Sequence, residues 1–295
     1  MTAGPGVRRV APVAAILSAA ALFGTTGTAQ ALGPPGATPL GIGAVRLLVG
    51  AAALLAIAGL RRSAGGGRWR EHAGALLLGG AAVAVYQLGW FAGLRRTGVA
   101  LGTVVGIGSG PVMAGVVHLL RRRQRLSRAW LLGTAVTVAG ASLLALRGAA
   151  ESAADPLGLL LVLTAVAGYV AYVEVARHAI QRGLDSTAAM AGMFGAGAVL
   201  LLPLLWLEPL GWLATGRGLA MALHLGLLTI GLAYTLYGWG LRFLPVATAV
   251  TLTLGEPLTA AGLGTLLLGE RLGVLGWVGA GLVGVGLVVA GRGEG

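Results

Sequence analysis

The chain has 295 residues, of which 57% are hydrophobic and only 10% are charged, and its mean hydropathy is +0.88. A soluble globular domain carries roughly 25% charged residues, so there is too little charge here to cover a water-facing surface. The formal net charge is +12, but every basic residue is an arginine and most lie in short connections between apolar runs, which favours membrane orientation over nucleic-acid binding.

Ten apolar runs follow one another along the chain, each close to the length of about 20 residues that spans a bilayer as a helix. They cover residues 12–32, 39–60, 73–94, 98–120, 129–146, 157–176, 187–207, 218–241, 245–268 and 272–291. The first run, with Arg8-Arg9 before it and Ala29-Gln30-Ala31 at its end, imitates a secretory signal peptide. It is long enough to span and it aligns with the sixth run, so we expect it to be retained as a membrane helix.

Arginines predict the orientation of these helices. With the N-terminus inside, fifteen of the 21 arginines fall in inner segments, five in outer loops, and Arg46 lies within a span. An excess of arginine marks cytoplasmic loops. The sequence therefore predicts a multi-pass protein of a bacterial plasma membrane with both termini in the cytoplasm. The bacterial source is suggested by the Gly/Ala-rich, all-arginine composition.

An internal repeat runs through the chain with an offset of 146 or 147 residues. Gly93-Leu94-Arg95 recurs as Gly240-Leu241-Arg242, Pro111 corresponds to Pro257, and Gly133 and Gly140 correspond to Gly279 and Gly286. Each repeat holds five helices, and an odd number places the two halves in opposite orientations across the membrane. We therefore predict an all-α membrane protein of ten transmembrane helices built as two inverted repeats, residues 1–148 and 149–295. Inverted repeats are a construction plan of secondary transporters.

The ends of the two repeats resemble the EamA-type family of the drug/metabolite transporter superfamily. The resembling stretches are Pro245-Val246-Ala247-Thr248-Ala249, then Glu256-Pro257-Leu258-Thr259-Ala260-Ala261, then Leu268-Gly269-Glu270-Arg271-Leu272 and the glycine-spaced last helix. The first repeat carries a degenerate copy, with Gly110-Pro111-Val112-Met113-Ala114 and with Gln124-Arg125-Leu126 in place of Glu270-Arg271-Leu272. The resemblance implies export, or sometimes uptake, of small metabolites such as amino acids, sugars or drugs without ATP.

Proline inside a helix removes one backbone hydrogen bond, and paired Gly/Pro interruptions in the two halves of a transporter indicate its binding site. Corresponding interruptions are predicted in the fourth helix of each repeat, at Ser109, Gly110 and Pro111 and at Gly255 and Pro257. An ordinary kink is the alternative.

Intramembrane charges are costly and usually functional. Glu256 is predicted to bind a cationic substrate group or to carry the coupling proton, and a structural carboxylate paired with Arg46 is the alternative. Thr248 and Thr251 are placed on the same polar helix face, with Glu256 at its border. Arg46 is expected to pair with a carboxylate or to bind an anionic substrate.

Aromatic residues concentrate on the third and eighth helices. Tyr86 and Trp90 share one face, Tyr234 and Tyr237 share another, and these faces could line a substrate cavity with cation–π capacity or could simply pack helices. Tyr169 and Tyr172 rank behind them as candidates. Glu174 is expected to pair with Arg177 or His178 at helical spacing.

Glycines spaced as in Gly89 and Gly93 are expected to let helices approach closely, and a homodimer through the fifth and tenth helices is a further expectation. The chain lacks cysteine, and its histidines are scattered, so no metal, cofactor or catalytic residue is predicted. The predicted function is a secondary active transporter, an exporter of small metabolites such as amino acids or drugs working by alternating access and coupled to protons, with small-molecule substrate and membrane lipid as partners. The alternatives are a lipid or polyprenyl-carrier translocator and a membrane-embedded enzyme.

Overall fold

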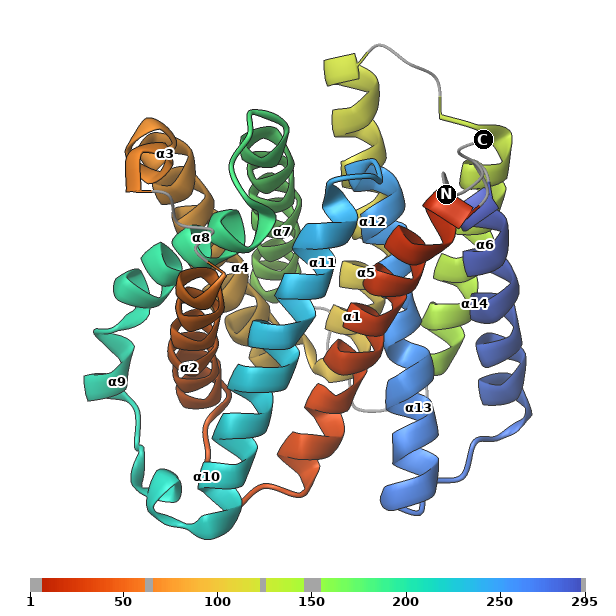
Figure 1. Cartoon of the computed structure of the whole chain (residues 1–295). Coiled ribbons are helices and arrows are strands. Elements are labelled where there is room, and N and C mark those ends of the chain that lie inside the picture. Colours follow the sequence, from red (N-terminus) through yellow and green to blue (C-terminus); the bar gives the residue numbers. More distant parts are fainter. Residues whose placement is uncertain (1–6, 62–65, 123–125, 146–154, 293–295) are drawn as a thin grey trace.

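The computed structural model describes residues 7–61, 66–122, 126–145 and 155–292, and within these ranges the regular structure is entirely helical (Figure 1). Both ends of the described chain lie on the same side of the bundle, which we call the terminal face. Several sequence features lie outside the described residues: Gln124, Arg125, Arg147, Glu151, Glu294 and the predicted boundary between residues 148 and 149.

The first repeat consists of long helices joined by short turns. They are α1 (Val7–Ala31), α2 (Pro39–Leu60), α4 (Ala73–Thr97), α5 (Val99–Arg122) and α6 (Arg128–Ala145), with a short α3 (Gly66–Glu71) before α4. Thr38 begins α2 because its side chain accepts a hydrogen bond from the Gly41 amide at 3.1 Å, with Pro39 at a first-turn position that needs no donor.

The second repeat is more interrupted. It contains α7 (Pro156–Gln181), α8 (Ser186–Leu201), α9 (Leu204–Leu207), a 3₁₀ turn η2 (Gly211–Ala214) and α14 (Val274–Arg292). Its eighth predicted crossing is built from α10 (Gly216–Leu223), a π-helical segment η3 (His224–Leu232) and α11 (Ala233–Leu241). Its ninth is built from α12 (Val246–Leu252), a 3₁₀ turn η4 (Thr253–Gly255) and α13 (Glu256–Leu267).

Nine helical stretches of the described residues are long and apolar enough to cross a membrane. The seventh predicted crossing, 187–207, is where the count differs, because α8 has only 16 residues and ends before Pro203. The structure thus confirms an all-helical multi-pass arrangement, whereas the number ten remains a prediction.

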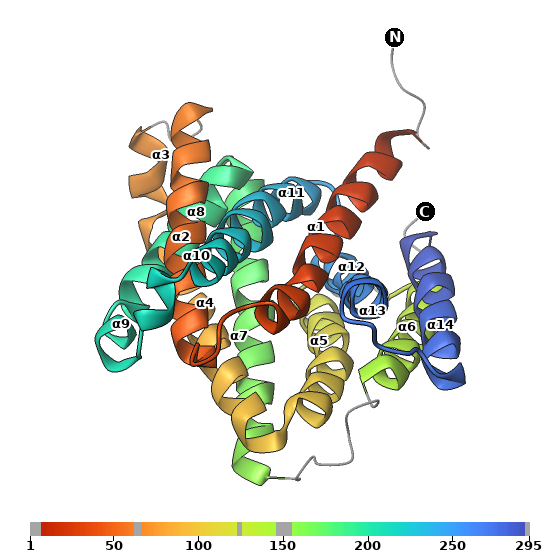
Figure 2. The ribbon, with the colours of Figure 1, turned by 90° about the horizontal axis from the view of Figure 1, so that it is seen from below.

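Helices of one repeat pack on helices of the other, and the same pairing occurs twice. α1 of the first repeat packs on α11 of the second, and α7, which corresponds to α1, packs on α4, which corresponds to α11. Viewed from below, α6 and α14 lie side by side at one edge of the bundle, with α2, α4 and α8 toward the opposite edge (Figure 2). Such an exchange is what a two-fold relation between the halves requires.

Glycine allows the α6–α14 pair to approach backbone to backbone. A Cβ built on Gly140 would lie 2.6 Å from the Gly279 carbonyl oxygen, and one on Gly279 would lie 2.7 Å from the Gly140 carbonyl oxygen. Gly133 and Gly286 face each other in the same way, each with the partner's carbonyl oxygen at 2.7 Å. The four glycines that correspond under the repeat therefore pack within the chain.

Asp155 connects the repeats on the side opposite the terminal face. Its carboxylate accepts a hydrogen bond from Arg96 at 2.6 Å and caps α7 by accepting from the Leu157 amide at 3.0 Å. Partial desolvation works to raise the pKa of this carboxyl, but the hydrogen bonds from Arg96 and the α7 backbone lower it overall. Asp155 is therefore held ionised at the start of the second repeat.

Candidate functional site

Pro257 interrupts the ninth crossing near its middle. Proline has no N–H, so it cannot donate to the Thr253 carbonyl four residues back. The Glu256 amide takes that carbonyl instead, closing the tighter η4 turn, and α13 then begins with Glu256 and Pro257. The predicted interruption at Gly255 and Pro257 is thus present in the structure.

The corresponding interruption at Pro111 is absent, and the prediction of a break at Ser109, Gly110 and Pro111 was wrong. α5 continues from Val99 to Arg122 with Pro111 inside it. Ser109 donates to the Gly106 carbonyl at 3.3 Å, within its own helix. The two repeats therefore differ at this point: the broken segment and its acid are in the second repeat alone.

Glu256 faces the interior of the bundle from the first turn of α13. Its side chain is exposed, yet it lies within electrostatic reach of Arg46 on α2, Tyr86 on α4 and Tyr169 on α7. Groups on three other helices could not all be near a side chain that pointed into lipid. On the other side, α1 packs against the break, because a Cβ on Gly24 would lie 2.7 Å from the Thr259 Cβ.

Arg46 is held in place by neutral groups. It donates from Nη2 to the Gln87 side-chain oxygen at 3.0 Å, and its guanidinium lies 5.5 Å from the centre of the Phe91 ring. Gln87 is anchored in turn by donating to the Gly43 carbonyl at 3.4 Å. In the part of the chain that the structure describes, no ion pair joins Arg46 to Glu256, so the expected pairing with a carboxylate is not observed.

All five tyrosines of the chain belong to one cluster, which also receives Trp90, Phe194 and Phe23. Ring centres are 5.8 Å apart for Tyr86 and Tyr169, 5.4 Å for Tyr169 and Tyr172, 6.2 Å for Tyr172 and Tyr234, and 5.9 Å for Tyr234 and Tyr237. The cluster joins α4 and α7 to α11. We call Arg46, Tyr86, Trp90, Tyr169 and Glu256 the central site, because these five are partly or fully exposed while the remaining tyrosines are buried.

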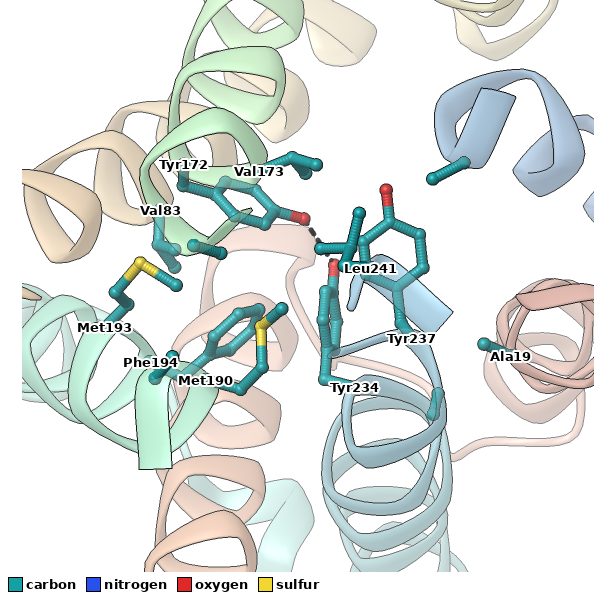
Figure 3. Close-up of a cluster of buried hydrophobic side chains, with 14 of the residues drawn as sticks. Ala19, Val83, Tyr172, Val173, Met190, Met193, Phe194, Tyr234, Tyr237 and Leu241 are labelled. Carbon is teal, nitrogen blue, oxygen red and sulfur yellow. Dashed lines mark hydrogen bonds between the residues drawn. The ribbon is translucent and has the colours of Figure 1, made fainter. Parts of the chain in front are cut away.

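The buried tyrosines pack against the central site from inside the bundle. Tyr237 is fully buried and its hydroxyl lies 3.2 Å from that of Tyr169, which also lies 3.3 Å from the Thr253 hydroxyl beside the helix break. Tyr172 and Tyr234 share a buried hydrogen bond of 2.7 Å, and Phe194 lies next to Tyr234 (Figure 3). The sequence ranked Tyr169 and Tyr172 behind the other aromatic residues, whereas the structure places both in the same cluster.

The Tyr172–Tyr234 hydrogen bond offers a test of how these buried tyrosines pack. We expect Tyr172→Phe to destabilise the protein by about 1–2 kcal/mol, because the Tyr234 hydroxyl is left buried without its partner. The double variant Tyr172→Phe/Tyr234→Phe should recover part of that loss, since no hydroxyl is then left unpaired. The melting temperatures of the four proteins measure the coupling, and strictly additive losses would contradict it.

Thr248 and Thr251 lie in α12, before the helix break. Both are almost completely buried in α12, where the Thr251 hydroxyl lies 3.1 Å from that of Thr134 on α6 and donates to the Ala247 carbonyl at 3.0 Å. A 3₁₀ turn separates both residues from Glu256, so a constant helical rotation per residue does not relate them to it. Thr253, within that turn, contacts Tyr169 of the central site.

Two polar contacts were not predicted. His224, at the start of the π-helical segment, lies 2.8 Å from the Thr25 hydroxyl of α1. Glu174 lies 3.9 Å from Arg121 of α5, an ion pair between the two repeats. Among the described residues, no three His, Asp or Glu side chains come together as metal ligands would.

Comparisons with known proteins agree with this architecture. Residues 11–146 and again residues 156–292 match the EamA-like transporter family. A Bacillus subtilis (strain 168) protein named uncharacterized transporter YwfM is 38% identical over 274 residues, covering 93% of this chain and 91% of its own length. A Pseudomonas aeruginosa protein, uncharacterized protein PA1977, is 34% identical over 235 residues, covering 78% of this chain and 76% of its own.

A solved structure described only as the crystal structure of a protein superimposes with a TM-score of 0.83 over 96% of both chains, at 20% identity, and so supports the fold. The helical spans, the two matched segments and the transporter-named relative together define a multi-pass membrane transporter. The chain belongs to the EamA-like transporter family.

Proposed function

We propose that the chain is a secondary active exporter of small metabolites in a bacterial plasma membrane, working by alternating access between two inverted halves. The seventh predicted crossing would consist of α8 and α9 together, which makes ten crossings and puts both termini on one side of the membrane. The arginine distribution makes that side the cytoplasm. The exchange of packing partners between the repeats supports this proposal, because related halves can swap the shapes that open one face and then the other.

One observation carries the proposal about the substrate: a cation and an acid reach the same aromatic space from different helices. The charges of Arg46 and Glu256 both act on Tyr86, and the two groups are not neutralised by a direct ion pair. A molecule with a carboxylate and an ammonium group, such as an amino acid, presents the complementary pair. Arginine suits the carboxylate, Glu256 suits the ammonium, and tyrosine and tryptophan faces attract cations.

Glu256 is also the proposed site of proton coupling. It is a titratable acid beside a helix break, and intramembrane acids facing a cavity commonly carry protons in transporters. Proton and ammonium would compete for the same carboxylate, so loading one and releasing the other would couple their movements.

A flux measurement tests the proposed function. Purified protein is screened by thermal shift against amino acids, amines and nucleobases, and the compounds that stabilise it are then assayed in proteoliposomes with an imposed pH gradient. We expect saturable flux that collapses when the gradient is dissipated by an ionophore. Flux of a lipid or polyprenyl carrier with no response to the small-molecule panel, or hydrolytic activity without flux, would overturn the proposal.

A further inference from the structure

A polar cavity lies away from the central site, near the terminal face. It has a volume of about 240 Å³ and is lined mainly by the last turns of α5 and α7, with Val246 of α12 beside them. Its polar lining consists of His118, Arg121, Glu174, Arg177, His178 and Gln181. None of these residues belongs to the central site.

Both helices turn a continuous polar face toward this cavity. On α7, Arg177, His178 and Gln181 lie three, four and seven residues after Glu174, which places the four along one side of the helix, and His118 and Arg121 on α5 are three apart. Two arginines oppose one glutamate, so the lining carries a formal charge of +1 before either histidine is protonated.

The two arginines of the cavity differ in how closely neighbouring groups hold them. Arg177 is nearly buried and donates to the carbonyl oxygens of Leu241, at 2.7 Å, and Leu244, which fixes it against the end of α11. Arg121 is more open: its side chain is 64% exposed, and its distance of 3.9 Å from Glu174 is at the outer limit of an ion pair. A ligand can therefore approach Arg121 without breaking a close contact.

We propose that this cavity binds a phosphate-bearing anion that joins the two repeats at the terminal face. Arg121 and His118 of the first repeat and His178 of the second would hold it, and Glu174 would weaken its binding by competing for Arg121. Arginine is the residue best suited to phosphate oxygens, and basic pockets between transmembrane helices bind anionic lipid headgroups. The phosphate comes either from such a headgroup or from a free solute.

Binding across α5 and α7 has a consequence for conformation. The anion contacts both repeats at once, so it favours the arrangement in which they meet at this face. The site is separate from the central one, and binding to it is measured without a transport assay. The result therefore does not depend on the proposed transport function.

The test uses the full chain with two probes. In lipid-free detergent, inorganic phosphate is compared with chloride at equal ionic strength. In nanodiscs, phosphatidylglycerol is compared with phosphatidylcholine. We expect one of the two phosphate sources to raise the melting temperature by about 2–4 °C. Arg121→Gln should abolish the rise, whereas the control Arg128→Gln, an exposed arginine at the start of α6, should keep it.

A variant that binds the anion more tightly distinguishes a specific site from a general effect of substitutions on folding. Glu174→Gln removes the competing carboxylate and should lower the concentration needed for half the stabilisation at least about threefold. If Arg121→Gln is not monodisperse, His118→Ala makes the same comparison. A response to inorganic phosphate identifies a solute site, and a response only to phosphatidylglycerol identifies a headgroup site. No rise with either source, or equal rises in Arg121→Gln and Arg128→Gln, would overturn the proposal.

Discussion

Replacing Gly286 with leucine is expected to prevent stable folding. The Cβ alone would lie 2.6 Å from the Thr137 amide nitrogen and 2.7 Å from the Gly133 carbonyl oxygen. These are backbone atoms of α6, so they cannot turn aside as the end of a flexible side chain could. Overpacking commonly costs 1–3 kcal/mol, and here α6 and α14 must separate along their shared face, so we expect a loss of more than about 3 kcal/mol.

The same helix supplies a matched control. Gly281 of α14 has no neighbour within 4 Å of a built Cβ and is exposed, so Gly281→Leu adds the same side chain toward open space. We expect Gly286→Leu to lower the melting temperature by at least about 10 °C or to lose its monodisperse peak, while Gly281→Leu stays within about 2 °C of the parent. Equal behaviour of the two variants would show that α6 and α14 do not pack as described.

These glycines illustrate what the sequence could reveal about the fold. Their common offset of 146 residues identified Gly133 with Gly279 and Gly140 with Gly286, and apolar runs predicted most helix bounds to within a few residues. That the four glycines face one another could not be read from the sequence, because spacing alone does not distinguish packing inside a chain from packing between chains.

The candidate site was less predictable, for two physical reasons. Pro111 and Pro257 correspond under the repeat, yet α5 continues through Pro111 whereas the segment before Pro257 tightens into a 3₁₀ turn. That turn also means that a constant rotation per residue cannot be carried from Thr248 and Thr251 to Glu256. Tyr169 gained its importance from Tyr86 and Tyr237 on other helices, which is tertiary information.

Glu256→Gln is expected to abolish gradient-driven transport in proteoliposomes. Glutamine keeps the size of the side chain but can neither bind a proton nor hold a charge, so flux should fall to that of protein-free liposomes. If the carboxylate also binds the ammonium group, its loss costs about 2 kcal/mol or more, which corresponds to roughly a 30-fold weaker affinity for an amine substrate.

Glu270→Gln is the matched control for that substitution. Glu270 follows α13 in the turn after Gly269, where its amide donates to the Gly264 carbonyl at 3.0 Å and its carboxylate lies over Gly264, at the far end of the helix that Glu256 begins. We expect this variant to retain both flux and gradient dependence.

Measuring binding and flux together assigns the chemistry of Glu256. Unchanged substrate affinity with loss of gradient dependence indicates a proton carrier, because the substrate then does not need the charge. Loss of both affinity and flux indicates that the carboxylate contacts the substrate, with Arg46 holding the opposite end. Full gradient-driven flux in Glu256→Gln would leave the acid with a structural role and would overturn its assignment as the coupling group.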